Sequence, residues 1–262
     1  MYRAPINEIK FLFKNLFKMN EIFNSKDINT FDEDILDGIL EEVGKLSENL
    51  IFPINKDGDK NPACLKDREV ILPKSFYNAY KSIAEGGWIG ISGDTKYGGL
   101  GLPLVFTTCV NELLSSACLS LALNPLMTQG QIEALEIHAN EDIKKIFLPK
   151  LNSGEWCGTM NLTEPQAGSD VGALRTAAKK DSDGNYKIDG QKIYISWGDH
   201  SLSSNICHLL LARLPNSPSG TKGISLFLVP KYIPDNYGNL IARNTINTLS
   251  LEQKMGLHGS PT

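Results

Sequence analysis

The feature that most constrains this chain is a change in the spacing of its apolar residues near position 155. From residue 30 to about residue 150, apolar side chains recur every three or four positions, which is the period of amphipathic helices. Beyond residue 155, short segments rich in β-forming residues alternate between apolar and polar positions and are separated by Gly and Pro turn signals. The sequence therefore predicts an α+β protein, with a helical domain at 1–154 and a β domain at 155–262.

The helical part contains recognisable start and stop signals. Thr30 and Glu33 fit a capping box that starts one helix. A second helix is predicted between Pro73 and the pair Gly86-Gly87. The run 104–123 is apolar on nearly every side, which indicates a helix in the middle of a bundle. We expect this helix to end before Pro125, and two further amphipathic helices to follow at 131–138 and 142–151.

The second part reads as mostly antiparallel sheet. Asp183-Gly184 and Asp189-Gly190 are hairpin turn signals, and residues 186–195 alternate around them. Segments 206–214 and 223–229 are short, rich in β-formers and separated by a Pro/Ser/Gly breaker. We expect an antiparallel, β-barrel-like domain that is incomplete, because the chain stops at Thr262 in a stretch typical of a mid-protein loop.

Composition excludes several classes of protein. The 30 acidic side chains outnumber the 26 basic ones and no Lys/Arg block occurs, so a nucleic-acid partner is not expected. The five cysteines include no C-x-x-C pair and no zinc spacing, which is typical of reduced thiols in a cytoplasmic protein. The first 23 residues read as an amphipathic helix with Lys10, Lys14 and Lys18 at helical spacing, so we predict neither a signal peptide nor a membrane span.

Other potentially reactive side chains carry no pattern that indicates a site. The four histidines (His138, His200, His208 and His258) lack metal-binding spacing and are interpreted as structural, and no metal site is predicted. Cys157 has no neighbour in sequence that would lower the pKa of its thiol, so we interpret it as a strand residue.

The most informative segment is 160–170, Met-Asn-Leu-Thr-Glu-Pro-Gln-Ala-Gly-Ser-Asp, directly after a predicted strand. It combines a Pro-restrained turn, the hydroxyls of Thr163 and Ser169, and Gly168, which lets a backbone approach a ligand closely. Backbone N–H groups and hydroxyls held in such a loop suit a ring system that accumulates negative charge. The alternative is that the segment is merely two turns joining strands.

This segment resembles the T-E-P-x-A-G-S-D flavin-binding loop of the acyl-CoA dehydrogenases. A second match, Gly190-Gln-Lys-Ile-Tyr-Ile-Ser196, is similar to the family's G-x-K-x-W-I-T strand, with Tyr194 and Ser196 in place of Trp and Thr. Alone, this stretch reads equally as an alternating strand with one exposed tyrosine. The turn 96–102 is similar to the family's E-x-Y-G-G-L-G-L turn, with Lys96 near the place where an acid is usual. The opening 1–5, the long insert before residue 70 and the segment 222–227 resemble the longer-chain branch that includes enzymes acting on 3-methylmercaptopropionyl-CoA and on aryl or branched acyl-CoA thioesters.

The resemblance implies a cofactor, a reaction and partners. The cofactor is FAD, and the reaction is the α,β-dehydrogenation of an acyl-CoA thioester to trans-2-enoyl-CoA. The acceptor is an electron-transferring flavoprotein, and the assembly is a homodimer or homotetramer. In the family the catalytic base lies in a C-terminal helical bundle, so we expect it beyond Thr262 and expect 1–262 alone to be inactive. Ser169 should also bind substrate, and the flavin-binding residues would be Met160, Asn161, Leu162, Thr163, Gly168, Ser169, Tyr194, Ile195 and Ser196.

Two other functions fit the same residues. One is an acyl-CoA oxidase, or the related DNA-damage-response flavoprotein branch, which shares the flavin loop but lacks support here from a basic C-terminal region. The other is a non-catalytic truncated remnant that binds CoA or a partner subunit.

Overall fold

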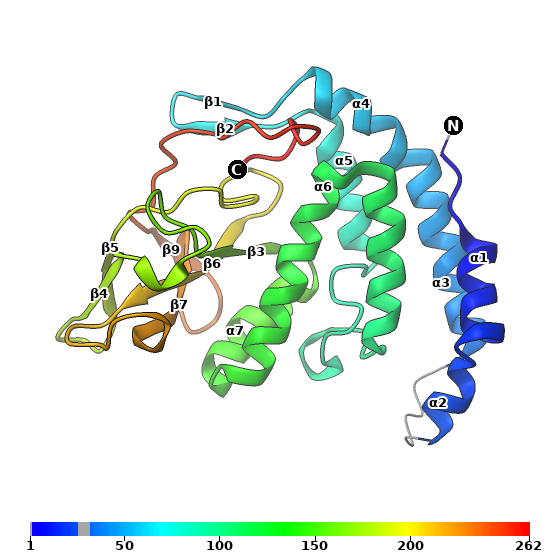
Figure 1. Ribbon diagram of the computed structural model, residues 1–262, viewed down its shortest axis with the longest axis horizontal. Coiled ribbons are helices and arrows are strands. Elements are labelled where there is room, and N and C mark those ends of the chain that lie inside the picture. The colour runs from blue at the N-terminus through cyan, green and yellow to red at the C-terminus, as the bar shows by residue number, and fades with distance from the viewer. Residues whose placement is uncertain (1, 26–31) are drawn as a thin grey trace.

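The computed structural model describes residues 2–25 and 32–262, and it confirms a helical first part followed by a sheet-containing second part (Figure 1). The helices are α1 (Ile6–Phe11), α2 (Met19–Ser25), α3 (Glu33–Leu46), α4 (Phe52–Lys60), α5 (Ser75–Glu85), α6 (Leu104–His138) and α7 (Glu141–Asn152). Shorter helical turns are η1 (Leu12–Leu16), η2 (Ser47–Ile51), η3 (Thr95–Tyr97), η4 (Val171–Ala173) and η5 (Thr221–Gly223). The strands are β1 (Cys64–Lys66), β2 (Glu69–Ile71), β3 (Trp156–Asn161), β4 (Ala177–Lys180), β5 (Tyr186–Asp189), β6 (Asn205–Arg213), β7 (Ile224–Pro230), β8 (Tyr232–Pro234) and β9 (Leu240–Arg243).

The helix termini follow local capping chemistry. Helix α3 begins after Asp32, whose carboxylate accepts the backbone N–H of Asp34 at 2.8 Å. Thr30, half of the predicted capping box, lies outside the described residues. Helix α5 ends as predicted, because Gly87 adopts the left-handed φ of 74° that closes a helix.

Helix α6 differs from the prediction, which ended it before Pro125. It continues through Pro125 to His138, and its only non-helical residue is Cys118, with φ −156° and ψ 91°. The helical backbone is therefore interrupted at Cys118 and resumes after it, so α6 consists of two helical stretches joined by a kink. Pro125 removes one backbone donor, but the packing of a buried helix outweighs that loss.

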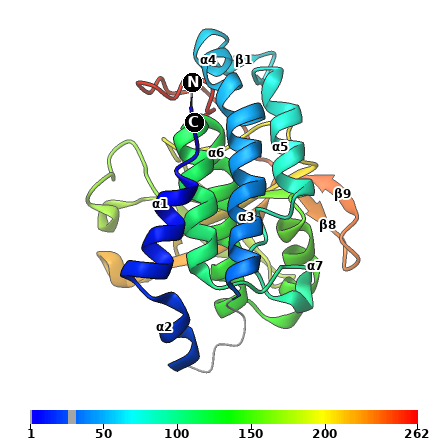
Figure 2. The ribbon, with the colours of Figure 1, turned by 90° about the vertical axis from the view of Figure 1, so that its right-hand side faces the viewer.

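Helix α6 is long and apolar enough to pass for a membrane span by composition alone. However, 56% of its most apolar window is buried inside the fold, and its buried side chains belong to the main hydrophobic core. Figure 2 shows α6 behind α1 and α3, as expected for the central helix of the bundle. The predicted central position of 104–123 is therefore confirmed.

The second part contains a mixed sheet with strand order β3-β6-β4-β5, and β7 pairs with β6. The hairpin predicted at Asp183-Gly184 is present between β4 and β5, and β6 pairs antiparallel with β7. The prediction of an antiparallel barrel is wrong in detail: β3 and β6 run parallel over six residue pairs, and the described strands form no closed barrel. The hairpin predicted at Asp189-Gly190 is also absent, because the residues that follow bond to a loop after β3 instead.

The helical part and the sheet share one hydrophobic core. Helix α6 packs against β3 so closely that a Cβ on Gly158 would lie 2.8 Å from the Cβ of Gln131. After β9 the chain returns to the helices, where Ala63 donates its backbone N–H to the carbonyl of His258 at 2.9 Å. In Figure 1 this returning segment runs above the sheet toward α4 and α5. It therefore connects the sheet side of the molecule to the helical side.

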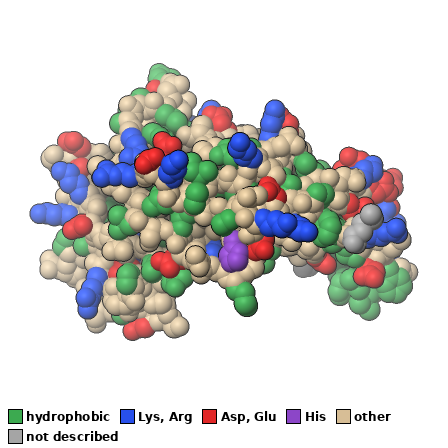
Figure 3. All heavy atoms as spheres, turned by 90° about the horizontal axis from the view of Figure 1, so that it is seen from above, with side chains coloured by type: hydrophobic (Ala, Val, Ile, Leu, Met, Phe, Trp, Pro, Cys, Tyr) green, Lys and Arg blue, Asp and Glu red, His purple; other side chains and the backbone are tan. Residues whose placement is uncertain are grey.

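The predicted amphipathic helix at the N-terminus is divided into α1, η1 and α2. Lys14 is exposed and forms a surface ion pair with Glu33 of α3 at 3.0 Å. Exposed apolar side chains nevertheless remain, including Phe11, Leu16 and Phe17. Figure 3 shows hydrophobic side chains gathered at the end of the molecule that carries α1 and α2.

Candidate functional site

Two loops that are about 30 residues apart in sequence lie side by side at the carboxyl end of β3. The backbone N–H of Ile193 donates to the carbonyl of Thr163 at 2.9 Å. The ammonium group of Lys192 donates to the carbonyl of Leu162, also at 2.9 Å. These two bonds bring the 160–163 and 192–196 segments, which were singled out separately in the sequence, into one site.

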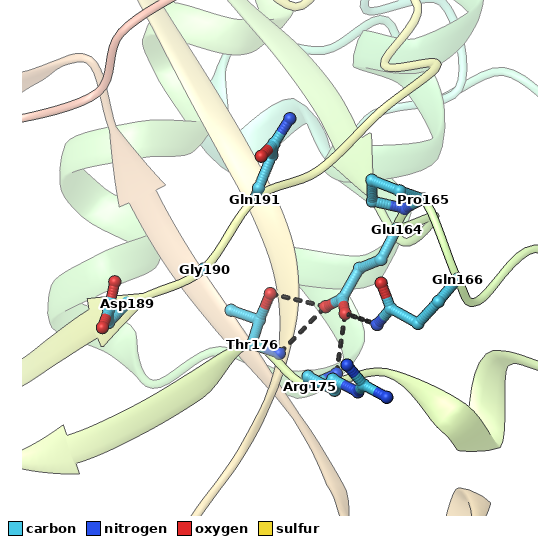
Figure 4. Close-up of a pocket in the computed structure, with 8 residues that line it drawn as sticks. All are labelled: Glu164, Pro165, Gln166, Arg175, Thr176, Asp189, Gly190 and Gln191. Carbon is cyan, nitrogen blue, oxygen red and sulfur yellow. Dashed lines mark hydrogen bonds between the residues drawn. The ribbon is translucent and has the colours of Figure 1, made fainter.

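A buried ion pair joins the same two loops. The carboxylate of Glu164 lies 2.9 Å from the ammonium of Lys192, and their side chains are only 3% and 6% exposed. Glu164 also accepts the backbone N–H groups of Arg175 at 2.7 Å and Thr176 at 3.0 Å, together with the Thr176 hydroxyl (Figure 4). The carboxylate is therefore saturated with donors, which is what allows a charge to be buried here.

The electrostatics of Glu164 follow from these contacts. Burial alone would raise the pKa of its carboxyl, but the hydrogen bonds from Arg175, Thr176 and Lys192 outweigh burial and lower that pKa from 4.5 to about 2. Glu164 is thus ionised at neutral pH. Its role in the site is to hold the loops in register, and it has no spare lone pair directed at a ligand.

The loop that carries Ser169 is shaped by a tight turn and then pinned by an arginine. Glu164 and Ala167 exchange both backbone hydrogen bonds, at 3.0 and 2.9 Å, around Pro165-Gln166. Farther along, the guanidinium of Arg213 on β6 donates to the carbonyls of Leu174 at 2.9 Å, Pro218 at 3.0 Å, Gly220 at 2.9 Å and Gly172. Residues 168–170 are therefore held at both ends while their own surface stays exposed.

Three hydroxyls and one aromatic ring of the predicted site are available for a ligand. The side chains of Thr163, Ser169 and Ser196 make no hydrogen bond within residues 2–25 and 32–262, and none of the three residues is fully buried. The Tyr194 side chain is 55% exposed. At Gly168 an added Cβ would meet no protein atom within 4 Å, so the backbone is open to an approaching molecule. This set of groups can bind a flat ring that carries hydrogen-bond acceptors.

The remaining predicted residues contribute differently. Met160 and Asn161 end strand β3, and the Asn161 side chain is buried, where its amide oxygen accepts the Thr159 hydroxyl at 2.8 Å. Ile195 is half-buried, and its carbonyl accepts the backbone N–H of Gly198 at 3.0 Å. Among the described residues, no hydrogen bond joins Ser169 to the 194–196 segment.

Of the histidines interpreted as structural, His200 and His208 are buried, as is Cys157, whereas His138 and His258 are exposed. Burial lowers the pKa of His200 to about 3 and that of His208 to about 4, so both rings are neutral at neutral pH. His208 Nδ1 lies 2.6 Å from the Thr159 hydroxyl, and burial raises the pKa of the Cys157 thiol. In the part of the chain that the structure describes, no three metal-ligating side chains gather into a possible site.

The prediction from sequence missed the residues that hold the loops. Glu164 and Lys192 lie inside the segments 160–170 and 190–196. Opposite charges in two segments that are expected to lie together are a signal that can indicate a buried ion pair. Arg213 and Trp197 carried no such signal, because their partners are backbone carbonyls, which no side-chain pattern marks, and the Leu174 and Ser120 carbonyls are far away in sequence. These anchors became evident only from the fold.

Comparison with known proteins finds two matching family models. The model of the acyl-CoA dehydrogenase N-terminal domain matches residues 41–155, and that of the acyl-CoA dehydrogenase middle domain matches residues 159–262. The chain is 41% identical over 261 residues to a 3-methylmercaptopropionyl-CoA dehydrogenase of Ruegeria pomeroyi and 38% identical over 269 residues to a butyryl-CoA dehydrogenase of Syntrophomonas wolfei. Both alignments cover 100% of this chain but only 44% and 43% of those relatives, so the chain spans less than half of their length.

Solved structures with a similar fold also include acyl-CoA dehydrogenases. An acyl-CoA dehydrogenase from Bacillus anthracis, solved in complex with FAD, superimposes with a TM-score of 0.69 at 23% identity. That superposition covers 88% of this chain and 35% of the other. At this level of identity the likeness concerns the fold.

Proposed function

Because the chain belongs to the acyl-CoA dehydrogenase family, whose N-terminal and middle domains it carries, we propose that it binds FAD for the α,β-dehydrogenation of an acyl-CoA thioester. The observation that carries the proposal is the hydrogen bond from Ile193 to Thr163, because it brings the two flavin-loop motifs together. FAD supplies the hydride acceptor when it is bound.

The groups present at the site fit a flavin. The hydroxyls of Thr163, Ser169 and Ser196 lack partners among the described residues, so they are free to donate to the nitrogens and carbonyls of the ring edge. The backbone of Met160, Asn161 and Leu162 would lie along that edge, and Gly168 leaves room for close approach. The exposed ring of Tyr194 would cover one face of the flavin, with Ile195 beside it.

In this proposal the chain binds and orients, and it does not itself move the α-proton. Glu164 is the acidic residue nearest the motif, yet its carboxylate accepts hydrogen bonds from several donors and the pKa of its carboxyl is about 2. A general base needs a pKa near the working pH and a clear approach to the proton. We therefore propose that Glu164 is not the catalytic base.

The substrate and partners follow from the relatives and stay proposals. Their names specify 3-methylmercaptopropionyl-CoA and butyryl-CoA, so we propose an acyl-CoA thioester whose acyl group is not further defined. We propose Ser169 as the residue that also contacts this thioester, an electron-transferring flavoprotein as acceptor, a homo-oligomer and a cytoplasmic location.

The proposal is tested by adding FAD and then a panel of short, branched and aryl acyl-CoA thioesters to the purified protein without oxygen. FAD should bind, and no thioester should bleach the oxidised flavin band, because in this proposal the chain does not itself move the α-proton. Ser169→Ala should lower both the flavin occupancy and the affinity of the protein for the thioesters. Unaltered flavin occupancy and thioester affinity would remove Ser169 from the site. Bleaching by any thioester would contradict the proposal that the chain only binds and orients.

A further inference from the structure

The residue that follows Ser196 is buried deeply in the helical core. Trp197 has no exposed side-chain surface, and its indole N–H donates to the carbonyl of Ser120 on α6 at 3.0 Å. Its backbone N–H donates to the carbonyl of Pro261 at 2.7 Å. Trp197 therefore links the candidate site to a central helix and to the segment that returns from the sheet.

Aromatic contacts fix the Trp197 ring from two sides. It stacks on Phe76 of α5 with ring centroids 6.3 Å apart and meets the edge of His200 at 5.4 Å. His200 is itself held, since its Nδ1 accepts the backbone N–H of Leu202 at 3.2 Å and its Nε2 lies 3.2 Å from the Asn124 amide nitrogen. The indole thus has little freedom to shift.

The backbone on either side of Ser196 is in an unusual conformation. Tyr194 and Trp197 have φ values of 59° and 56°, in the left-handed region that bulky side chains rarely adopt. Such a conformation persists only where the surrounding contacts require it, and it concentrates at functional sites. The turn is closed by the hydrogen bond from Gly198 N–H to the Ile195 carbonyl. The turn leaves the ring of Tyr194 exposed and Ser196 half-buried.

The segment is therefore held at two ends by different parts of the molecule. Lys192 and Ile193 bond to the 162–164 loop beside the sheet, whereas Trp197 is anchored among α5 and α6. We propose that Trp197 is a positioning residue that presents Tyr194 and Ser196 to the flavin. This inference rests on the proposed function, but the anchor itself can be tested without FAD.

The test compares Trp197→Phe with Trp156→Phe. Trp156 is a matched control because it is also fully buried in the same core, meets Phe147 edge to face, and has an indole N–H without a hydrogen-bond partner. Trp197→Phe keeps an aromatic ring but loses the bond to the Ser120 carbonyl. We expect its FAD dissociation constant to rise about fivefold to tenfold and its flavin circular dichroism to change, whereas Trp156→Phe should leave both unchanged.

Hydrogen exchange without FAD separates the anchor from the cofactor. The amides of Ile193, Trp197 and Gly198 should exchange faster in Trp197→Phe and not in Trp156→Phe. Equal effects of the two variants on FAD affinity and exchange would overturn the proposal. If the wild-type protein binds no FAD, but the amides still exchange faster in Trp197→Phe than in Trp156→Phe, the proposed function fails and the anchoring role of Trp197 stands. Should Trp197→Phe not fold, Phe76→Leu, which removes the stacked ring, must give the same exchange pattern, and its failure to do so would overturn the proposal.

Discussion

The helical part and the two loops of the candidate site are held together by different kinds of contact. Helices α3, α5 and α6 bury apolar side chains such as Leu40, Phe76 and Leu113, which pack in one shared core. The loops depend in addition on the ion pair of Glu164 with Lys192, on the hydrogen bonds of Arg213, and on Trp197, whose ring joins the core while its indole N–H donates to the Ser120 carbonyl. The comparison indicates that apolar packing builds the frame, whereas a few long-range polar anchors set the geometry of the site.

The strongest test of this difference is Lys192→Met. It removes one partner of a buried ion pair and leaves the Glu164 charge without its cation, which should lower the free energy of unfolding by about 3 to 5 kcal/mol. Chemical denaturation with and without FAD would measure the loss. Lys179→Met, at an exposed position on β4, is the control and should change stability by less than about 0.5 kcal/mol. Equal effects of the two variants would mean that the buried pair does not hold the loops.

The ion pair of Glu164 with Lys192 also predicts that the free energy of unfolding depends on pH, whereas the apolar contacts of the helical core carry no such dependence. The pKa of the Glu164 carboxyl is lowered from 4.5 to about 2 by folding, so its contribution is complete above pH 4.5 and is lost as the pH falls toward 2. That contribution is about 3 kcal/mol by linkage. In Glu164→Gln, this part of the decrease in stability at acid pH should be absent. Measuring the free energy of unfolding at a series of pH values tests this. An unchanged acid slope in that variant would contradict the assignment.

The same contrast explains what could be predicted from sequence. The helices and their order follow from the period of apolar residues, and the β4–β5 hairpin follows from Asp183-Gly184, because these are local signals. The parallel pairing of β3 with β6 depends on contacts between distant segments. So does the conformation of Gly190–Ser196, which bonds to the loop after β3 and forms no hairpin. The motifs located the candidate loops, but no local pattern indicates that Trp197 would reach Ser120 or that Arg213 would bind carbonyls.

A third prediction concerns ligand affinity without loss of the fold. Thr163→Val removes a hydroxyl that has no partner among the described residues, so the stability of the free protein should stay nearly unchanged. FAD binding should weaken by about 1 to 3 kcal/mol, because a bound donor is lost. Thr221→Val, at an exposed position in η5, is the control. Titration of FAD fluorescence measures both, and identical affinities would exclude Thr163 as a ligand.

The smallest effect is expected at Tyr194. Tyr194→Leu should lose up to about 1.5 kcal/mol of aromatic contact with the flavin and should brighten its emission, since a stacked tyrosine quenches the ring. Tyr237→Leu, in which the replaced side chain is 90% exposed between β8 and β9, should alter neither quantity. An emission spectrum of the Tyr194 variant that matches the parent would place this ring away from the flavin.

The most direct test of the account is hydrogen exchange of the protein with and without bound FAD. If the two loops form one flavin site, FAD should slow exchange together at 160–163 and 192–197, and leave the amides of α3 in the helical part unchanged. Protection of only one loop, or protection confined to the helical part, would contradict the claim that the contacts between Thr163 and Ile193 build the site.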